Sequence, residues 1–167
     1  MEKIGKMKKI LVLMSVLFVC VGCDQGTKIT ARHVLKGQAP VSWLGDMFRL
    51  HYIENTGAFL GFGDQFSPHL RLVLFVGFVS LLLTGLLIYL LCSRRLRLTA
   101  LVAGGLILGG GVSNLIDRIL NRGAVVDFMN VGIGPLRTGI FNMADLAVMA
   151  GVILFVFYAN QAIKTRE

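Results

Sequence analysis

Three long stretches of the chain are almost free of charge, and a shorter apolar stretch lies near the N-terminus. Leu72–Cys92 and Leu98–Ile116 carry no charged residue, and Phe141–Ile163 carries only Asp145. Each is close to the roughly 20 residues that a helix needs to cross a bilayer. Lipid does not tolerate unpaired backbone groups, so these stretches should be helical. With the shorter stretch Ile10–Cys23, the pattern predicts four spans, at about 10–29, 70–92, 98–119 and 141–163.

The basic residues predict which way the spans face. The short segments 1–9, 93–97 and 164–167 hold nine Lys and Arg, whereas the much longer segments 24–71 and 117–145 together hold eight. Dense basic residues in short loops mark the cytoplasmic side of a membrane protein. We therefore expect both chain ends to be cytoplasmic, with extracytoplasmic segments at about 30–68 and 120–140.

The longer of these two segments has features of strands and turns. Residues 42–53 mix aromatic and β-branched side chains, and Gly57, Gly61 and Gly63 follow them. Such a composition between turn residues is typical of short strands. The predicted fold class is an all-α membrane protein, a single domain over residues 1–167, with four transmembrane helices and a small strand-bearing extracytoplasmic cap.

Composition excludes several classes of protein. Apolar residues make up 55% of the chain and charged residues only 16%, too apolar a balance for a small water-soluble domain. The net charge of +8 comes without a basic patch interleaved with aromatics, so we expect no nucleic-acid partner. Three cysteines in apolar runs, Cys20, Cys23 and Cys92, indicate neither a disulfide framework nor a zinc site.

The N-terminal stretch also imitates a lipoprotein signal. Lys8 and Lys9 precede an apolar run that ends in Gly22-Cys23-Asp24, where Cys23 would be the acylated residue. The alternative is that Cys23 is a small residue on the first span. A lipid-anchored protein has no need of three further spans, so the rest of the chain favours the span.

Polar residues interrupt the apolar runs near their predicted outer ends, where a charge in lipid is costly. Asp24 and Lys28 are four residues apart and share a helix face. The other groups at helical spacing are Asn114, Asp117 and Arg118 in the third span, and Asn142 and Asp145 at the start of the fourth. These groups either hold the bundle together or build a site at one level of the membrane.

Asp127 and Asp145 differ from the other acids. Neither has a basic residue three or four positions away, and both have apolar sequence neighbours. If they face each other in a poorly solvated site, the pair holds one proton at neutral pH. The ionised carboxylate then activates water while the protonated one polarises a carbonyl, as in aspartic proteases. The hypothesis is a peptide-bond hydrolase that needs no metal.

Five motifs carry a resemblance to a known family. They are Asp24-Gln25-Gly26-Thr27-Lys28, Asn55-Thr56-Gly57-Ala58-Phe59, Asn114-Leu115-Ile116-Asp117-Arg118, Val125-Val126-Asp127-Phe128 and Phe141-Asn142-Met143-Ala144-Asp145. In this order on a four-span chain they resemble the bacterial lipoprotein signal peptidases, or signal peptidase II. The resemblance covers about residues 24–151.

The resemblance implies an aspartic protease of the bacterial cytoplasmic (inner) membrane, without metal or cofactor and with its active site on the extracytoplasmic side. It implies that Asp127 and Asp145 are the catalytic pair. The substrates would be diacylglyceryl-modified prolipoproteins, cut before the lipidated cysteine, with membrane lipid and globomycin-type inhibitors as further partners. Residues implied in substrate binding or support are Asp24, Lys28, Asn55, Gly57, Asn114, Asp117, Arg118, Asn142 and Ala144.

Two positions depart from the family pattern, and one rival class stays open. Phe59 follows Ala58 directly, where the family has a second Ala, and Ser113 replaces a Gly. The spacing also allows Asn114 and Asn142 to donate amide hydrogens to an oxyanion. The rival is a non-enzymatic protein, a proton-coupled carrier or an assembly factor, whose intramembrane carboxylates relay protons.

Overall fold

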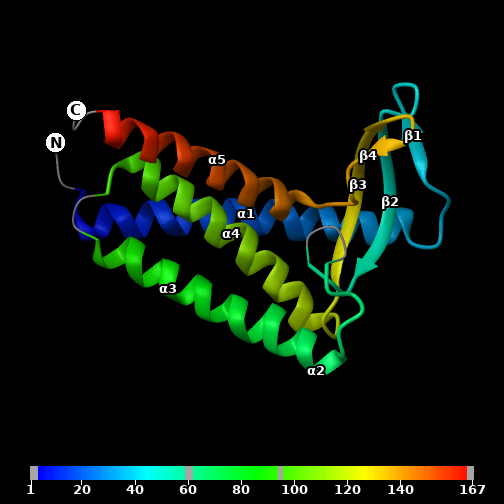
Figure 1. Cartoon of the computed structure of the whole chain (residues 1–167), viewed down its shortest axis with the longest axis horizontal. Coiled ribbons are helices and arrows are strands. Elements are labelled where there is room, and N and C mark those ends of the chain that lie inside the picture. The colour runs from blue at the N-terminus through cyan, green and yellow to red at the C-terminus, as the bar shows by residue number, and fades with distance from the viewer. Residues whose placement is uncertain (1–3, 59–61, 94–95, 165–167) are drawn as a thin grey trace.

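The computed structural model describes residues 4–58, 62–93 and 96–164. A bundle of helices makes up most of the molecule, and a small sheet lies across one end of it (Figure 1). Both ends of the chain lie at the opposite end of the bundle. The sheet and the chain termini are thus separated by the length of the helices, as the charge pattern predicts.

The bundle contains four helical rods. The first is α1 (Lys6–Leu35) and the second joins α2 (Pro68–Arg71), a π-helical segment η2 (Leu72–Phe78) and α3 (Val79–Cys92). The third and fourth are α4 (Leu98–Leu120) and α5 (Met143–Lys164).

Three of these rods are long and apolar enough to cross a bilayer, namely Lys6–Leu35, Pro68–Cys92 and Leu98–Leu120. Apolar side chains such as Phe18 and Leu81 are exposed on their outer faces, which suits contact with lipid rather than water. The apolar part of α5 that meets these criteria is shorter, Met143–Ala159. The fold is therefore that of a multi-pass membrane protein, and the fourth crossing stays a prediction.

The first helix is longer than the span predicted for it. We expected the outer segment to begin near residue 30, but α1 continues to Leu35. The added turns bury Ala31 and Leu35 against Phe128 of the sheet. A tertiary contact made by a distant strand thus extends the helix beyond the apolar stretch that predicted it.

The sheet is antiparallel and its strands lie in the order β1-β2-β3-β4. β1 (Val41–Trp43) and β2 (Phe48–Asn55) come from the segment predicted to contain strands. β3 (Val125–Ile133) and β4 (Leu136–Arg137) come from the 120–140 segment, for which no strands were predicted. The cap therefore joins two stretches of chain that are far apart in sequence. Of the three glycines expected at turns, Gly61 lies outside the described residues.

Pairing of β2 with β3 brings two of the sequence motifs together. Asn55 pairs with Val125 and Ile53 pairs with Asp127 in the antiparallel register, which shifts between Leu50 and Ile53. The register places the Asn55 motif beside the Val-Val-Asp-Phe motif, where β2 ends and β3 begins.

α4 is the centre of the bundle, and glycines allow its neighbours to approach closely. A Cβ atom on Gly110 would lie 2.3 Å from the Ala144 carbonyl oxygen of α5. On Gly109 it would lie 2.6 Å from Cys20 Cβ of α1. Small residues at these contacts are typical of helix packing in membranes. The close packing aligns the polar ends of α1, α4 and α5.

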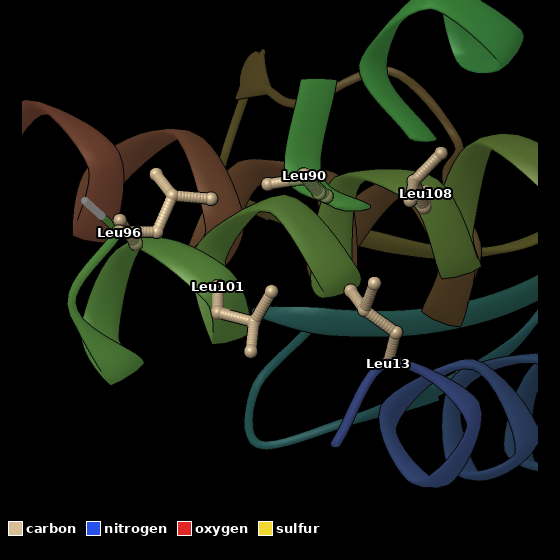
Figure 2. Close-up of a cluster of buried hydrophobic side chains, with 6 residues drawn as sticks. Leu13, Leu90, Leu96, Leu101 and Leu108 are labelled. Carbon is tan, nitrogen blue, oxygen red and sulfur yellow. The ribbon is translucent and has the colours of Figure 1, made fainter. Parts of the chain in front are cut away.

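A leucine cluster fills the bundle toward the end that holds the termini. Figure 2 shows Leu13 extending from α1 toward α4, which carries Leu101 and Leu108. Lys9, one of the basic residues used to orient the chain, is buried here, and its Nζ donates hydrogen bonds to the Leu90 and Ser93 carbonyls at the end of α3. Lys9 therefore caps a helix instead of facing water. Of the other basic residues used, Lys3, Arg94, Arg95 and Arg166 lie outside the described residues.

Candidate active site

Asp127 is buried on β3, and two asparagine amides hold its carboxylate. Asn55 Nδ2 donates to Oδ2 at 2.9 Å and Asn142 Nδ2 donates to Oδ1 at 2.6 Å. Asn55 reaches Asp127 across the β2–β3 pair, whereas Asn142 comes from the start of α5. Both oxygens of a carboxylate on the sheet are thereby fixed relative to the helical bundle.

Asp145 lies in the first turn of α5 and forms a capping box with Asn142. The Asp145 backbone N–H donates to Asn142 Oδ1 at 2.9 Å, and the Asn142 backbone N–H donates to Asp145 Oδ2 at 3.1 Å. Such reciprocal bonds satisfy two otherwise unpaired donors at a helix start. The second oxygen, Oδ1, accepts from Asn114 Nδ2 of α4 at 3.0 Å.

The two carboxylates line the same small cavity. Its volume is about 20 Å³, and Asn55, Asn114 and Arg118 also contribute to its wall. A cavity of this size holds roughly one water molecule. Asn142 bonds to both aspartates at once, through its side chain and its backbone. The structure therefore brings together the two acids that the sequence singled out.

The environment of Asp127 favours its protonated form. The pKa of Asp127 is raised to about 6, mainly by burial. The charge of Asp145 contributes to this rise, and the hydrogen bond from Asn55 opposes it. Such a carboxyl group exchanges a proton near neutral pH, as a general acid or base requires.

A buried ion cluster lies behind the two acids. Lys28 Nζ is 2.6 Å from Asp24 Oδ2 and 3.0 Å from Asp117 Oδ2. It also donates to Asn114 Oδ1 at 2.9 Å. Because Lys28 has only donors, it must meet the carbonyl oxygen of that amide. The amide nitrogen of Asn114 is left to face Asp145.

The same two acids of the cluster hold the backbone next to the site. Asp24 Oδ1 accepts the Ala144 N–H at 2.8 Å, and Asp117 Oδ2 accepts the Val126 N–H at 3.0 Å. Ala144 precedes Asp145 and Val126 precedes Asp127 in the chain. The predicted pairs Asp24–Lys28 and Asn142–Asp145 are both in contact. Asp117 bonds to Lys28 instead of to the adjacent Arg118, whose Nη2 donates to the Gly57 carbonyl.

Arg118 supports the site from a different side. Its Nη2 donates to the Gly57 carbonyl at 2.9 Å, and its guanidinium lies 5.5 Å from the centre of the Phe75 ring. The Gly57 N–H in turn donates to Asn55 Oδ1 at 3.0 Å. With its oxygen engaged, Asn55 presents its amide nitrogen to Asp127. Arg118 and Gly57 thus orient Asn55.

Two further side chains, buried Ser113 and half-buried Gln25, belong to the network although the sequence analysis gave them no role. Ser113 Oγ donates to Asp24 Oδ2 at 2.7 Å, and Gln25 Nε2 donates to Asp117 Oδ1 at 3.0 Å. Gln25 follows Asp24 directly in the chain, so the four-residue helical spacing that selected Asp24 and Lys28 did not include it. The departure at Ser113 therefore adds a hydrogen bond inside the network. The other departure, at Phe59, lies outside the described residues.

The amides of Asn114 and Asn142 are already engaged with the carboxylates. In this structure these amides orient the two acids, and their donation to an oxyanion stays a prediction. Among the described residues no group of three or more His, Cys, Asp and Glu could hold a metal ion. Two carboxyl groups, those of Asp127 and Asp145, line the cavity, and proton transfer is the chemistry that carboxyl groups supply.

Fold and site together define a multi-pass membrane protein with a buried polar centre at one end of its helices. Solved structures share this architecture. A bacterial membrane enzyme determined by the in meso method at 2.3 Å resolution superposes with a TM-score of 0.80 at 25% identity, covering 99% of this chain and 95% of that one. A second bacterial membrane enzyme, at 1.9 Å resolution, gives a TM-score of 0.73.

Sequence comparison identifies the family. The profile of signal peptidase (SPase) II matches residues 16–160, so the chain belongs to the signal peptidase II family. A lipoprotein signal peptidase of Streptomyces griseus is 36% identical over 156 residues, which cover 89% of this chain and 73% of the relative. One from Chlorobium luteolum is 35% identical, with coverage of 92% and 93%.

Proposed function

We propose that the protein is an aspartic endopeptidase that removes the signal peptide from diacylglyceryl-modified prolipoproteins, cutting before the lipidated cysteine. The family supports peptidase activity on lipoprotein precursors. The observation that carries the aspartic mechanism is the cavity shared by Asp127 and Asp145. Asp24, Lys28, Asn55, Gly57, Asn114, Asp117, Arg118, Asn142 and Ala144 support this pair or the substrate.

In the proposed mechanism the two carboxyl groups share one proton. The ionised group takes a proton from a water molecule, whose oxygen bonds to the scissile carbonyl carbon. The protonated group gives its proton to the carbonyl oxygen. The tetrahedral intermediate then collapses: one of its two hydroxyl groups returns a proton to the carboxylate that had protonated the carbonyl oxygen, the C–N bond breaks, and the amine nitrogen receives the proton that came from water. The titration belongs to the pair rather than to either aspartate.

The location of the site suits a substrate held in lipid. We infer that all four helical rods cross the cytoplasmic membrane, with both termini inside and the sheet outside. The signal helix of a prolipoprotein then lies beside the bundle, and its scissile bond meets the site where the helices end. The family resemblance adds an expectation that globomycin-type inhibitors bind here.

Cleavage of a purified substrate tests the proposal. The wild-type protein in lipid vesicles should cut a diacylglyceryl-modified prolipoprotein before its lipidated cysteine, and globomycin should inhibit the cut. Asp127→Asn and Asp145→Asn should each abolish cleavage while the protein still inserts. Glu54→Gln is the matched control, because Glu54 is an exposed acid beside Asn55 that pairs with Lys36.

Two outcomes would refute the proposal. One is normal processing by either aspartate variant. The other is failure of the purified wild-type protein to cut the modified substrate, combined with solute uptake into vesicles that depends on Asp127 and Asp145. That second outcome would favour the carrier.

A further inference from the structure

A second and larger cavity lies beside the candidate active site. It measures about 480 Å³ and is lined by residues from the start of the Pro68–Cys92 rod and the end of α4. Four of its lining residues are basic or imidazole side chains, His69, Arg71, Arg118 and Arg122. No carboxylate is among the described residues that line it.

The arginines of this basic cavity are available to a ligand. Neither Arg71 nor Arg122 forms an ion pair with any residue that the structure describes. Arg118 donates to the Gly57 carbonyl, but its buried Nε has no partner among the described groups. Cations gathered in a partly enclosed cleft concentrate positive potential there. Guanidinium groups also suit the geometry of phosphate oxygens.

One side of the basic cavity is apolar and open. Leu72 and Ile119 line it and are 57% and 64% exposed. Both belong to rods that are apolar enough to cross a membrane. An occupant that satisfies both sides has an anionic head and hydrocarbon chains. A free phosphate ion would leave the apolar side without a partner.

We propose that the basic cavity binds the phosphate headgroup of an anionic membrane phospholipid, with its acyl chains lying along Leu72 and Ile119. The diacylglyceryl group of the proposed substrate carries no charge, so it does not account for Arg71 and Arg122. Arg118 lines both this cavity and the one shared by the two aspartates. A bound lipid would contact the guanidinium that orients Asn55 through Gly57.

Lipid retention by the full-length protein tests this site without any peptidase assay. The protein is extracted with equal amounts of phosphatidylglycerol and phosphatidylcholine, and the lipids that stay bound are counted by native mass spectrometry. The wild-type protein should retain phosphatidylglycerol preferentially. Arg71→Gln and Arg122→Gln should each lower that retention about fivefold, the effect of one basic residue at a membrane surface. Arg122→Lys, which keeps the charge, should restore most of it.

Three controls make the result decisive. Lys36→Gln removes a positive charge at the sheet end but outside the cavity, so it should retain lipid like the wild type. Asp127→Asn should also retain lipid, which separates this inference from the peptidase proposal. Circular dichroism confirms that each variant is folded.

The proposal is overturned by equal retention of the two lipids by the wild type, or by unchanged retention in the folded double variant of Arg71 and Arg122. Displacement of phosphatidylglycerol by inorganic phosphate would also overturn it, because a soluble anion would then be the better occupant.

Discussion

At the scale of single residues, Asp24 and Asp117 each hold the backbone N–H of the residue before a candidate catalytic aspartate. Lys28 forms ion pairs with both acids and fixes the amide of Asn114. The two candidate catalytic aspartates are therefore positioned in part by residues that do not bond to their carboxylates directly. A side chain that never touches the substrate can set the geometry of one that does.

Removing Lys28 should be strongly destabilising. Lys28→Met leaves Asp24 and Asp117 buried and without their cation, and breaking a buried ion pair from one side costs about 3–5 kcal/mol. The variant should unfold at lower temperature, or fail to accumulate, when measured by thermal unfolding in detergent.

The matched change is Lys36→Met, because Lys36 forms an exposed pair with Glu54 and exposed pairs contribute little. It should unfold close to the wild-type temperature. Equal stability of the two variants would show that the buried cluster does not hold the fold.

Asn55 should control the pH dependence of the reaction. Its hydrogen bond favours ionised Asp127 and so lowers the pKa of that carboxyl group. In Asn55→Ala the pKa of Asp127 rises above about 6, so the pair keeps its proton to higher pH. The alkaline limb of kcat/KM should then move to higher pH by up to about one unit, with a lower maximum.

The control for that profile is Asn121→Ala, because Asn121 accepts a hydrogen bond from exposed Arg32 and does not touch the aspartates. The alkaline limb of kcat/KM should lie at the same pH in this variant as in the wild type. An Asn55→Ala limb that stays in place, or moves to lower pH, would contradict the role assigned to this amide.

At the scale of helices and strands, prediction from sequence worked where one local signal decides the structure. Uninterrupted apolar runs predicted the helices, because backbone groups in lipid must pair within their own segment. Helical spacing also placed Asp24 with Lys28. It could not show that Lys28 reaches Asp117, because that contact joins α1 to α4.

The second half of the sheet shows where local signals fail. Strand β3 carries Asp127 and pairs with β2, although about 70 residues separate the partners. Val125 and Val126 are buried on consecutive positions, so the segment lacks the alternation that marks a half-exposed strand. The apolar sequence neighbours of the two acids, and the lack of a nearby basic residue, allowed us to predict that they come together. They did not allow us to predict that one acid would lie on a strand and the other at the start of a helix.

Gly110 should be essential to the fit of α4 against α5. A Cβ atom there would lie 2.3 Å from the Ala144 carbonyl oxygen, next to Asp145. Gly110→Ala must push α5 away, at a cost of about 1–3 kcal/mol for overpacking, and should reduce cleavage at least tenfold by moving Asp145 from Asn114.

Gly85→Ala is the matched control, because a Cβ atom on this helical glycine meets nothing within 4 Å. Its stability should be unchanged or slightly higher. Thermal unfolding and cleavage rates of both variants check the prediction. Full activity in Gly110→Ala would mean that α4 and α5 need not pack this closely for function.

At the scale of the whole molecule, the sheet and the chain termini lie at opposite ends of the bundle (Figure 1). The orientation of the bundle in the membrane therefore decides which side of the membrane the site faces. Leu44, which is 78% exposed at the β1–β2 turn, should face outward. In a variant with its three native cysteines replaced, Leu44→Cys should react with a membrane-impermeant maleimide in intact spheroplasts.

Ser93→Cys lies at the opposite end, at the C-terminus of α3, and should react only after the membrane is disrupted. The reverse pattern would place the site toward the cytoplasm and would overturn the proposed topology.

Asp127 and Asp145 are proposed to act as one catalytic pair. The decisive test is single-turnover cleavage of a diacylglyceryl-modified prolipoprotein by Asp127→Asn, Asp145→Asn and the double variant. Residues that act as a unit are strongly non-additive, so each single variant should lose as much rate as the double variant. Two partial losses that multiply in the double variant would show that the aspartates act independently, and would contradict the account.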